Sequence, residues 1–205
     1  MKSPIDDILE RMALLERELE RELRGAQARW RYRFEAGRVI FEREVHAAHA
    51  RVRRSVLRFL GESSLLNLLT APLIYGLVVP IALLDISITL YQQLCFRAYG
   101  IARVRRSGYI VIDRNHLAYL NAIEKLNCVY CGYANGVFAY VREVAGRTEQ
   151  YWCPIRHAKR VRAPHGLYRD FVDFGDAEGY RTRLLPLREE LREEPPVGAH
   201  PPRRR

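Results

Sequence analysis

The chain has 205 residues, of which 48% are hydrophobic and 10% are aromatic. This composition is too apolar for a disordered chain, and four cysteines are too few for a small fold built on disulfides. The length leaves room for roughly one or two domains, which excludes a large multidomain enzyme. Lysine and arginine exceed aspartate and glutamate by 34 to 24, so anionic partners have to be considered.

Residues 1–62 have the pattern of one long amphipathic helix. Ser3 and Pro4 suit the N-cap and the first helical position. Apolar or small residues then recur from Ile8 to Phe59 with a mean spacing of about 3.6 residues, the period of a straight α-helix rather than the 3.5 of a left-handed coiled coil. Such a stripe needs a cover, so we expect it to pack on the chain or to self-associate, as coiled coils do.

Two details could modify this helix. Gly25 or Gly37 could interrupt it, because glycine is a poor helix former. His46 and His49 lie three residues apart and would share a helix face, where they could hold a metal ion. No third ligand is close in the sequence, so we expect ordinary surface histidines.

Residues 63–96 predict a membrane segment. Residues 63–84 contain no charged side chain, and after Asp85 the run continues without charge to Phe96. About 20 apolar residues cross a hydrocarbon core, so residues 65–84 are long enough. The segment follows sixty residues of charged chain and is therefore no secretory signal. The alternative is the buried core helix of a soluble domain.

The topology of this segment stays open between a hairpin and a single span. Four arginines flank each end, namely Arg51, Arg53, Arg54 and Arg58 before it and Arg97, Arg103, Arg105 and Arg106 after it. The positive-inside rule is satisfied if both flanks lie in the cytoplasm, which a hairpin bent at Pro72, Gly76 or Pro80 would allow. The segment is short for two complete spans, so a single span remains possible. Asp85 would either face a partner inside the membrane or lie at its surface.

The cysteines of residues 97–180 predict a metal site. We expect a short β-type run at 109–113, a helix from Asn115, and a tight turn at Cys128 and Cys131. Cys153 and His157 follow 21 intervening residues later as a C-x3-H pair. Three thiolates and one imidazole complete a tetrahedral zinc shell and leave no open position, which points to a structural site.

Three alternatives remain for these cysteines. Cys95 could replace His157 as the fourth ligand, giving four thiolates that suit zinc or an iron–sulfur cluster. The C-x2-C pair could instead cycle between dithiol and disulfide. Finally, the cysteines could simply be small buried hydrophobic residues.

The strings CVYCGYANG, which begins at Cys128, and EQYWCPIRHA, which begins at Glu149, follow a proline-containing apolar segment. In this they resemble a group of small uncharacterised bacterial membrane proteins, over roughly residues 65–180. The resemblance implies residence in a bacterial inner membrane. It implies no activity.

Residues 181–205 predict a short amphipathic helix despite Pro186, followed by a disordered basic tail from residue 194. Most of the basic charge brackets the apolar segment, so anionic lipid headgroups explain it better than nucleic acid does. No phosphate-binding loop, nucleophile elbow or metalloprotease helix is present.

The sequence thus predicts a mainly α-helical, membrane-anchored protein with soluble parts in the cytoplasm. Its expected divisions are 1–62, 63–96, 97–180 and 181–205. We expect a non-enzymatic scaffold or adaptor with a structural zinc site, partnered by lipid and by a second copy or another membrane protein. The alternative is a membrane-associated redox protein.

Overall fold

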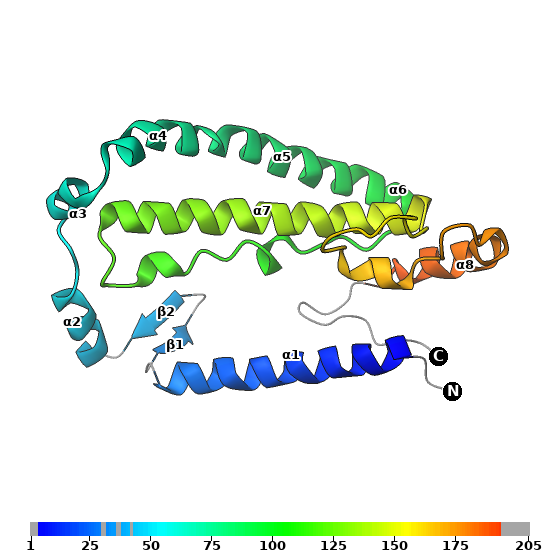
Figure 1. Cartoon of the computed structure of the whole chain (residues 1–205), viewed down its shortest axis with the longest axis horizontal. Coiled ribbons are helices and arrows are strands. Elements are labelled where there is room, and N and C mark those ends of the chain that lie inside the picture. Colours follow the sequence, from blue (N-terminus) through cyan, green and yellow to red (C-terminus); the bar gives the residue numbers. More distant parts are fainter. Residues whose placement is uncertain (1–3, 30–31, 36–37, 42, 194–205) are drawn as a thin grey trace. The chain divides into compact units, whose positions relative to one another are not determined.

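The computed structural model describes residues 4–29, 32–35, 38–41 and 43–193 and is mainly helical (Figure 1). The chain forms two compact units. Unit 1 comprises Met1–Ser63 and Asp113–Cys128, and unit 2 comprises Ser64–Ile112 and Val129–Arg205.

Unit 1 begins with helix α1, Pro4–Arg29, followed by a β-hairpin of strands β1, Tyr32–Glu35, and β2, Arg38–Phe41. The strands pair antiparallel, with Tyr32 opposite Phe41. The prediction of one helix over residues 1–62 is therefore wrong, although α1 starts at Pro4 as expected. The helix is not interrupted at Gly25, and Gly37, the other possible break, lies outside the described residues. In β1, aromatic residues alternate with charged ones, and β2 contains two β-branched residues and one aromatic residue. Both compositions favour strands over helix.

Two short helices complete the first part of unit 1, namely α2, Arg43–Arg51, and α3, Val56–Glu62. Ser55 caps α3, and its side-chain oxygen accepts a hydrogen bond from the backbone N–H of Arg58 at 3.3 Å. The His49 ring packs edge-on against Phe41 and Tyr119, with ring centroids 5.0 and 5.2 Å apart. His49 is thus an aromatic packing residue, while His46 is exposed on α2.

Unit 2 begins with one continuous apolar helix, Leu65–Tyr99. It consists of α4, Leu65–Gly76, α5, Val78–Tyr91, a π-helical turn, Gln92–Phe96, and α6, Arg97–Tyr99. Leu77 joins α4 to α5 with helical dihedral angles. The hairpin interpretation of residues 63–96 is wrong, because the chain does not reverse. Prolines within a helix of this kind remove single hydrogen bonds without ending it.

The chain reverses only after Gly100, which adopts a left-handed φ of 71°. Residues 101–112 then return along α5 as an irregular segment with a single 3-10 turn at Arg106–Gly108. The strand predicted at 109–113 is absent from this part of the structure, since no partner strand lies beside it. Ile110 instead packs against Ile81 and Val137.

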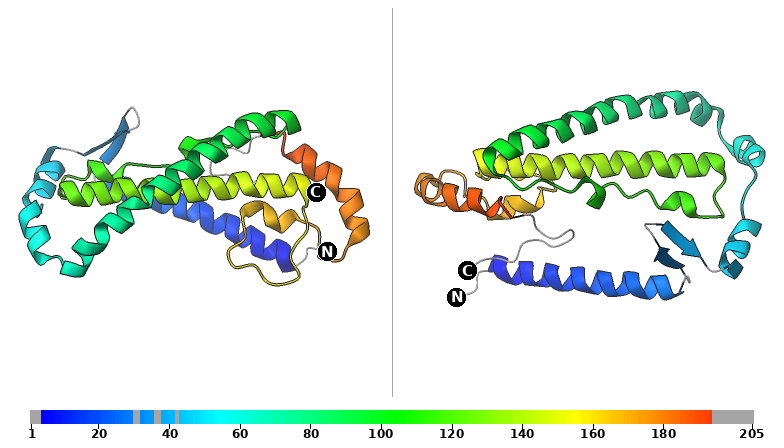
Figure 2. Two further views of the ribbon diagram at one scale, coloured as in Figure 1. Left: turned by 90° about the horizontal axis from the view of Figure 1, so that it is seen from above. Right: turned by 180° about the vertical axis from the view of Figure 1, so that it is seen from behind.

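Helix α7, Ala122–Trp152, is the long second helix. Asn121 and Glu124 form a capping box at its start, in which the Asn121 side chain accepts from the N–H of Glu124 at 3.0 Å and Glu124 accepts from the N–H of Asn121 at 2.8 Å. The helix runs without interruption through Cys128 and Cys131, where a turn was expected. Two views show α7 crossing the apolar helix while running in the same general direction (Figures 1 and 2).

Glycines allow α7 to be both continuous and closely packed. A Cβ on Gly136 would lie 2.7 Å from the Ile110 Cα, and one on Gly146 would lie 2.7 Å from His165 Nδ1. These residues resemble turn signals in the sequence, but in the structure they admit neighbouring segments to the helix surface.

Residues 153–176 form a loop with a short 3-10 helix, Gly166–Asp170, and lead to α8, Ala177–Glu190. Helix α8 overlaps the helix predicted from residue 181 but begins four residues earlier, and Pro186 lies inside it. The predicted disordered tail from residue 194 lies outside the described residues. The core of unit 2 is formed by α5 to α7, the returning segment and the end of α8, and its larger cluster of buried side chains comprises Phe96, Ile101, Val104, Tyr140, Val144 and Leu191.

Candidate functional site

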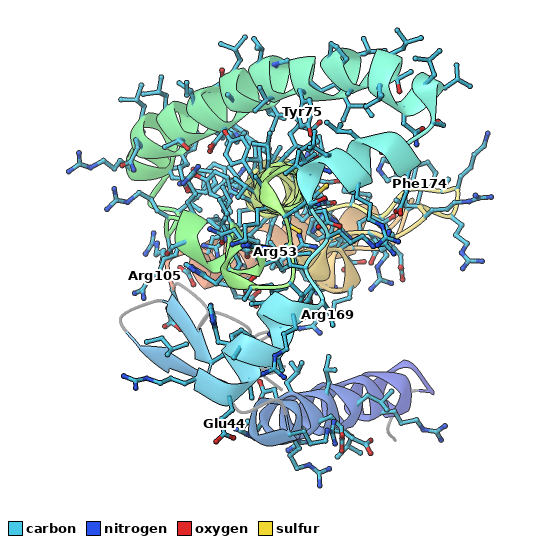
Figure 3. The ribbon with its side chains drawn as sticks, turned by 90° about the vertical axis from the view of Figure 1, so that its left-hand side faces the viewer. Glu44, Arg53, Tyr75, Arg105, Arg169 and Phe174 are labelled. Carbon is cyan, nitrogen blue, oxygen red and sulfur yellow. The ribbon has the colours of Figure 1, made fainter. Side chains whose placement is uncertain are left out.

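The apolar helix exposes most of its hydrophobic side chains. In its most apolar 18-residue window only 11% of the residues are buried, with a mean hydropathy of 2.2. Leu73 is 74% exposed and Leu94 is 72% exposed. The other large exposed residues along it are Leu65, Leu66, Leu68, Leu69, Ile74, Leu77, Val78, Val79, Leu83, Leu84, Ile86 and Leu90. Figure 3 shows side chains along the free side of this helix projecting outward, with few nitrogen or oxygen atoms among them.

Within the described residues, most apolar side chains of this helix are not buried against the rest of the chain. A core helix buries its apolar side chains, since each large one contributes roughly 1.5–3 kcal/mol when it leaves water. An exposed apolar surface of this extent marks a binding surface for lipid or protein. The structure therefore contains one helix long and apolar enough to cross a membrane, within the residues it describes.

The opposite face of the same helix packs against the rest of unit 2. Near its start, the Tyr75 ring meets the Tyr130 ring of α7 edge-on, with centroids 5.9 Å apart. Farther along, Ile81, Asp85 and Phe96 are buried. From Ile81 to Phe96 the helix thus has an inner face covered by α7 and the returning segment and an outer face without a cover, whereas α4 contains no buried residue.

Asp85 forms a buried ion pair on this inner face. The Arg106 guanidinium donates to both carboxylate oxygens, from Nη2 to Oδ2 at 2.6 Å and from Nε to Oδ1 at 2.9 Å. The Tyr133 hydroxyl donates to Oδ2 at 3.0 Å. Asp85 thus connects α5, the returning segment and α7, while the Arg106 side chain remains 45% exposed.

The surroundings of this cluster favour its ionised form. The hydrogen bond to Asp85 raises the pKa of Arg106 above its usual value. Burial, followed by the hydrogen bond to Asp85, raises the pKa of Tyr133, which keeps its hydroxyl proton on the ring. Both Asp85 carboxylate oxygens accept hydrogen bonds, so the cluster holds α5, the returning segment and α7 together.

Gln92 forms a second polar tie between the helix and the returning segment. Its Oε1 accepts from the backbone N–H of Val104 at 3.0 Å, and its Nε2 donates to the Val104 carbonyl at 3.3 Å. The same amide also donates to the Tyr140 hydroxyl. Because the irregular segment lacks a strand partner, these side-chain bonds satisfy backbone groups that would otherwise be buried without partners.

The predicted zinc ligands lie at opposite ends of α7. Cys128 and Cys131 lie three residues apart in its first half, whereas Cys153 directly follows its last residue. Residues 131–152 span about 32 Å of helix axis at 1.5 Å per residue. The structure therefore does not bring Cys131 and Cys153 within reach of one ion, and the sequence did not reveal this because it did not predict a continuous α7.

The remaining candidate ligands do not change this result. The backbone N–H of His157 donates to the Tyr168 hydroxyl at 2.7 Å, and its ring stacks on that of Tyr168. Cys95 lies in the π-helical turn of the apolar helix and is partly buried. Among the described residues, no group of three His, Cys, Asp or Glu side chains is arranged to hold a metal ion. Binding of zinc or of an iron–sulfur cluster stays a prediction.

An aromatic cluster marks the end of the apolar helix. The Tyr99 ring stacks on Tyr151 at 5.1 Å between centroids and meets Trp152 edge-on at 5.4 Å. The Arg188 guanidinium lies over the Tyr151 ring at 4.6 Å from its centroid. Aromatic rings near basic groups are typical of the boundary between lipid and water.

Comparison of the chain with protein-family models, with curated proteins and with solved structures finds no match. The geometry of the apolar helix, with the hydrogen bonds that Asp85 and Gln92 form on its inner face, is therefore the basis for assigning a function.

Proposed function

We propose that this protein is a membrane-bound, non-enzymatic scaffold whose apolar helix attaches unit 2 to a lipid bilayer. One observation carries the proposal, namely the outer face of Leu65–Tyr99, which remains exposed although it is strongly apolar. Water contact over that area is unfavourable, and hydrocarbon suits a mostly apolar surface that exposes no charged side chain before Arg97.

Charge near the helix supports lipid as the cover. Four arginines precede the helix within residues 51–58. Four more follow the apolar run within residues 97–106. Basic residues near a membrane surface gain about 1 kcal/mol each from anionic headgroups. The Tyr99 and Trp152 rings at the end of the helix suit the same boundary.

Unit 1 supports the scaffold part of the proposal. Helix α1 carries exposed leucines, including Leu15, Leu19 and Leu23, at helical spacing. Charged residues of both signs occupy the rest of its described surface. A helix with an exposed apolar stripe binds a partner helix or groove, so we propose that α1 contacts a second copy or another membrane protein. The proposal needs neither zinc nor redox chemistry.

Flotation with lipid vesicles tests this function. The purified protein should float with vesicles that contain anionic lipid. Replacing Leu69, Leu73 and Leu83 by glutamine should move most of it to the soluble fraction, because three apolar side chains of the outer face become polar. The matched control is Leu185→Gln on α8, where the leucine is also 66% exposed and floating should persist. Equal flotation of the triple variant and the control would overturn the proposal.

A further inference from the structure

We infer that the apolar helix lies along the surface of one membrane leaflet instead of crossing the bilayer. The inference rests on the proposed function, because it assumes that lipid covers the outer face. It specifies how the protein meets the membrane, and four features of unit 2 lead to it.

The first feature is the length of the outer face. Its exposed apolar residues extend from Leu65 to Leu94. At 1.5 Å per residue this is about 44 Å, whereas a hydrocarbon core measures about 30 Å. A helix perpendicular to the membrane would leave Ile86, Leu90 and Leu94 outside the core. A helix in the membrane plane keeps these three residues at the same depth as Leu69, Leu73 and Leu83, which share their face.

The second feature is the difference between the two faces over residues 81–96. The inner face carries Asp85 and Gln92 and is covered by the irregular segment 101–112. Arg103 and Arg105 on that segment are exposed. Irregular backbone and exposed arginines are not tolerated within hydrocarbon, so only the outer face can meet lipid.

The third feature is the contact between Tyr75 and Tyr130. If residues 65–84 crossed the membrane, Tyr75 would lie near the bilayer centre, and Tyr130 would lie there with it. Asn135 follows Tyr130 on α7 by five residues, about 8 Å along the helix axis, and its side chain is exposed. In the crossing orientation this amide would lie within hydrocarbon, where burying a polar group is unfavourable, which opposes that orientation.

The fourth feature is the symmetry of charge around the helix. Each flank contributes four arginines, and the positive-inside rule places both on the cytoplasmic side. A hairpin would have satisfied this rule, but the helix does not reverse. A helix in the membrane plane satisfies it without a reversal, since both ends reach the same layer of headgroups.

Depth-dependent fluorescence quenching in vesicles tests the inference. A small fluorescent amino acid is introduced singly at Leu73, Leu83 or Leu94 of the full chain, and lipids brominated near the headgroup or deep in the acyl chain serve as quenchers. The in-plane helix predicts quenching at all three positions, with the same preference for shallow bromine. The same label at Leu185 on α8 is the matched control and should not be quenched.

The other outcomes separate the inference from the proposed function. Deep quenching at Leu73 together with no quenching at Leu94 would overturn the in-plane orientation and leave membrane binding intact. Absence of quenching at all three positions would overturn both. If chemical cross-linking then joined two chains through this helix, a second copy would be the cover in place of lipid.

Discussion

Asp85 and Arg106 are 21 residues apart in the sequence, yet the Arg106 Nη2 lies 2.6 Å from the Asp85 Oδ2. The pair joins the apolar helix to the segment that returns along it. An acidic residue in an otherwise charge-free stretch is thus accounted for by a partner within the same unit. It lies on the inner face, opposite the residues proposed to meet lipid.

Breaking this pair should destabilise unit 2. Asp85→Asn keeps the size of the side chain and removes its charge, so the Arg106 guanidinium loses its ionic partner. We expect a loss of about 1–2 kcal/mol in the free energy of unfolding, moderated because Arg106 is partly exposed to solvent. Denaturant unfolding in detergent micelles, followed by circular dichroism, measures this change.

The control for the pair is Glu62→Gln, which breaks the exposed ion pair between Glu62 and Arg58 on α3. We expect no measurable change from this variant. A double-mutant cycle with Arg106→Gln should show that the Asp85 and Arg106 substitutions are not additive. Additive effects would mean that the two side chains act independently.

Gly136 on α7 should tolerate no side chain. A Cβ at this position would lie 2.7 Å from the Ile110 Cα and 2.8 Å from the Tyr109 carbonyl oxygen, so the backbone of the returning segment would have to move. We expect Gly136→Ala to destabilise the protein by about 1–3 kcal/mol, a typical cost of overpacking. Thermal unfolding monitored by circular dichroism provides the measurement.

Gly76→Ala is the matched control, because nothing lies within 4 Å of the added methyl group. Alanine is a better helix former than glycine, so this variant should be as stable as the original protein or slightly more stable. If both variants lowered the melting temperature equally, the close approach of Ile110 to α7 would not explain the effect.

The separation of the cysteines leads to a prediction about metal content. Cys131 and Trp152, the last residue of α7 and the neighbour of Cys153, are about 32 Å apart along the helix axis, so one ion cannot bind to Cys131 and Cys153 in this structure. Whatever zinc Cys128 and Cys131 retain should be unaffected by Cys153→Ser. Elemental analysis of the purified variants measures zinc per chain, with Cys131→Ser as the comparison. If both variants lost the same equivalent of zinc, the result would support a shared Cys3His centre and contradict this prediction.

The apolar helix could be predicted from the sequence because its signal is one-dimensional. A charge-free run longer than a bilayer core requires no knowledge of the partner segments, and the helix from Leu65 follows from it. Helix α8 was found for a similar reason, since the amphipathic pattern outweighed Pro186.

The parts that sequence could not predict depend on contacts between distant segments. The glycines of α7 resemble breaks until Ile110 and His165 are seen to occupy the space above Gly136 and Gly146. Several arginines near Asp85 could have been its partner, and only the path of the returning segment selects Arg106. The cysteine spacing suited a folded metal site, but it suits a continuous helix equally well.

The contact of the apolar helix with lipid is tested most directly by measuring the environment of Leu73 in the membrane-bound protein. A nitroxide side chain at this position can be tested by electron paramagnetic resonance for collisions with oxygen, which concentrates in lipid, and with a water-soluble nickel chelate. We predict high accessibility to oxygen and low accessibility to nickel at Leu73, and the reverse at Leu185. High accessibility to nickel at Leu73 would contradict the proposal that lipid covers the apolar helix.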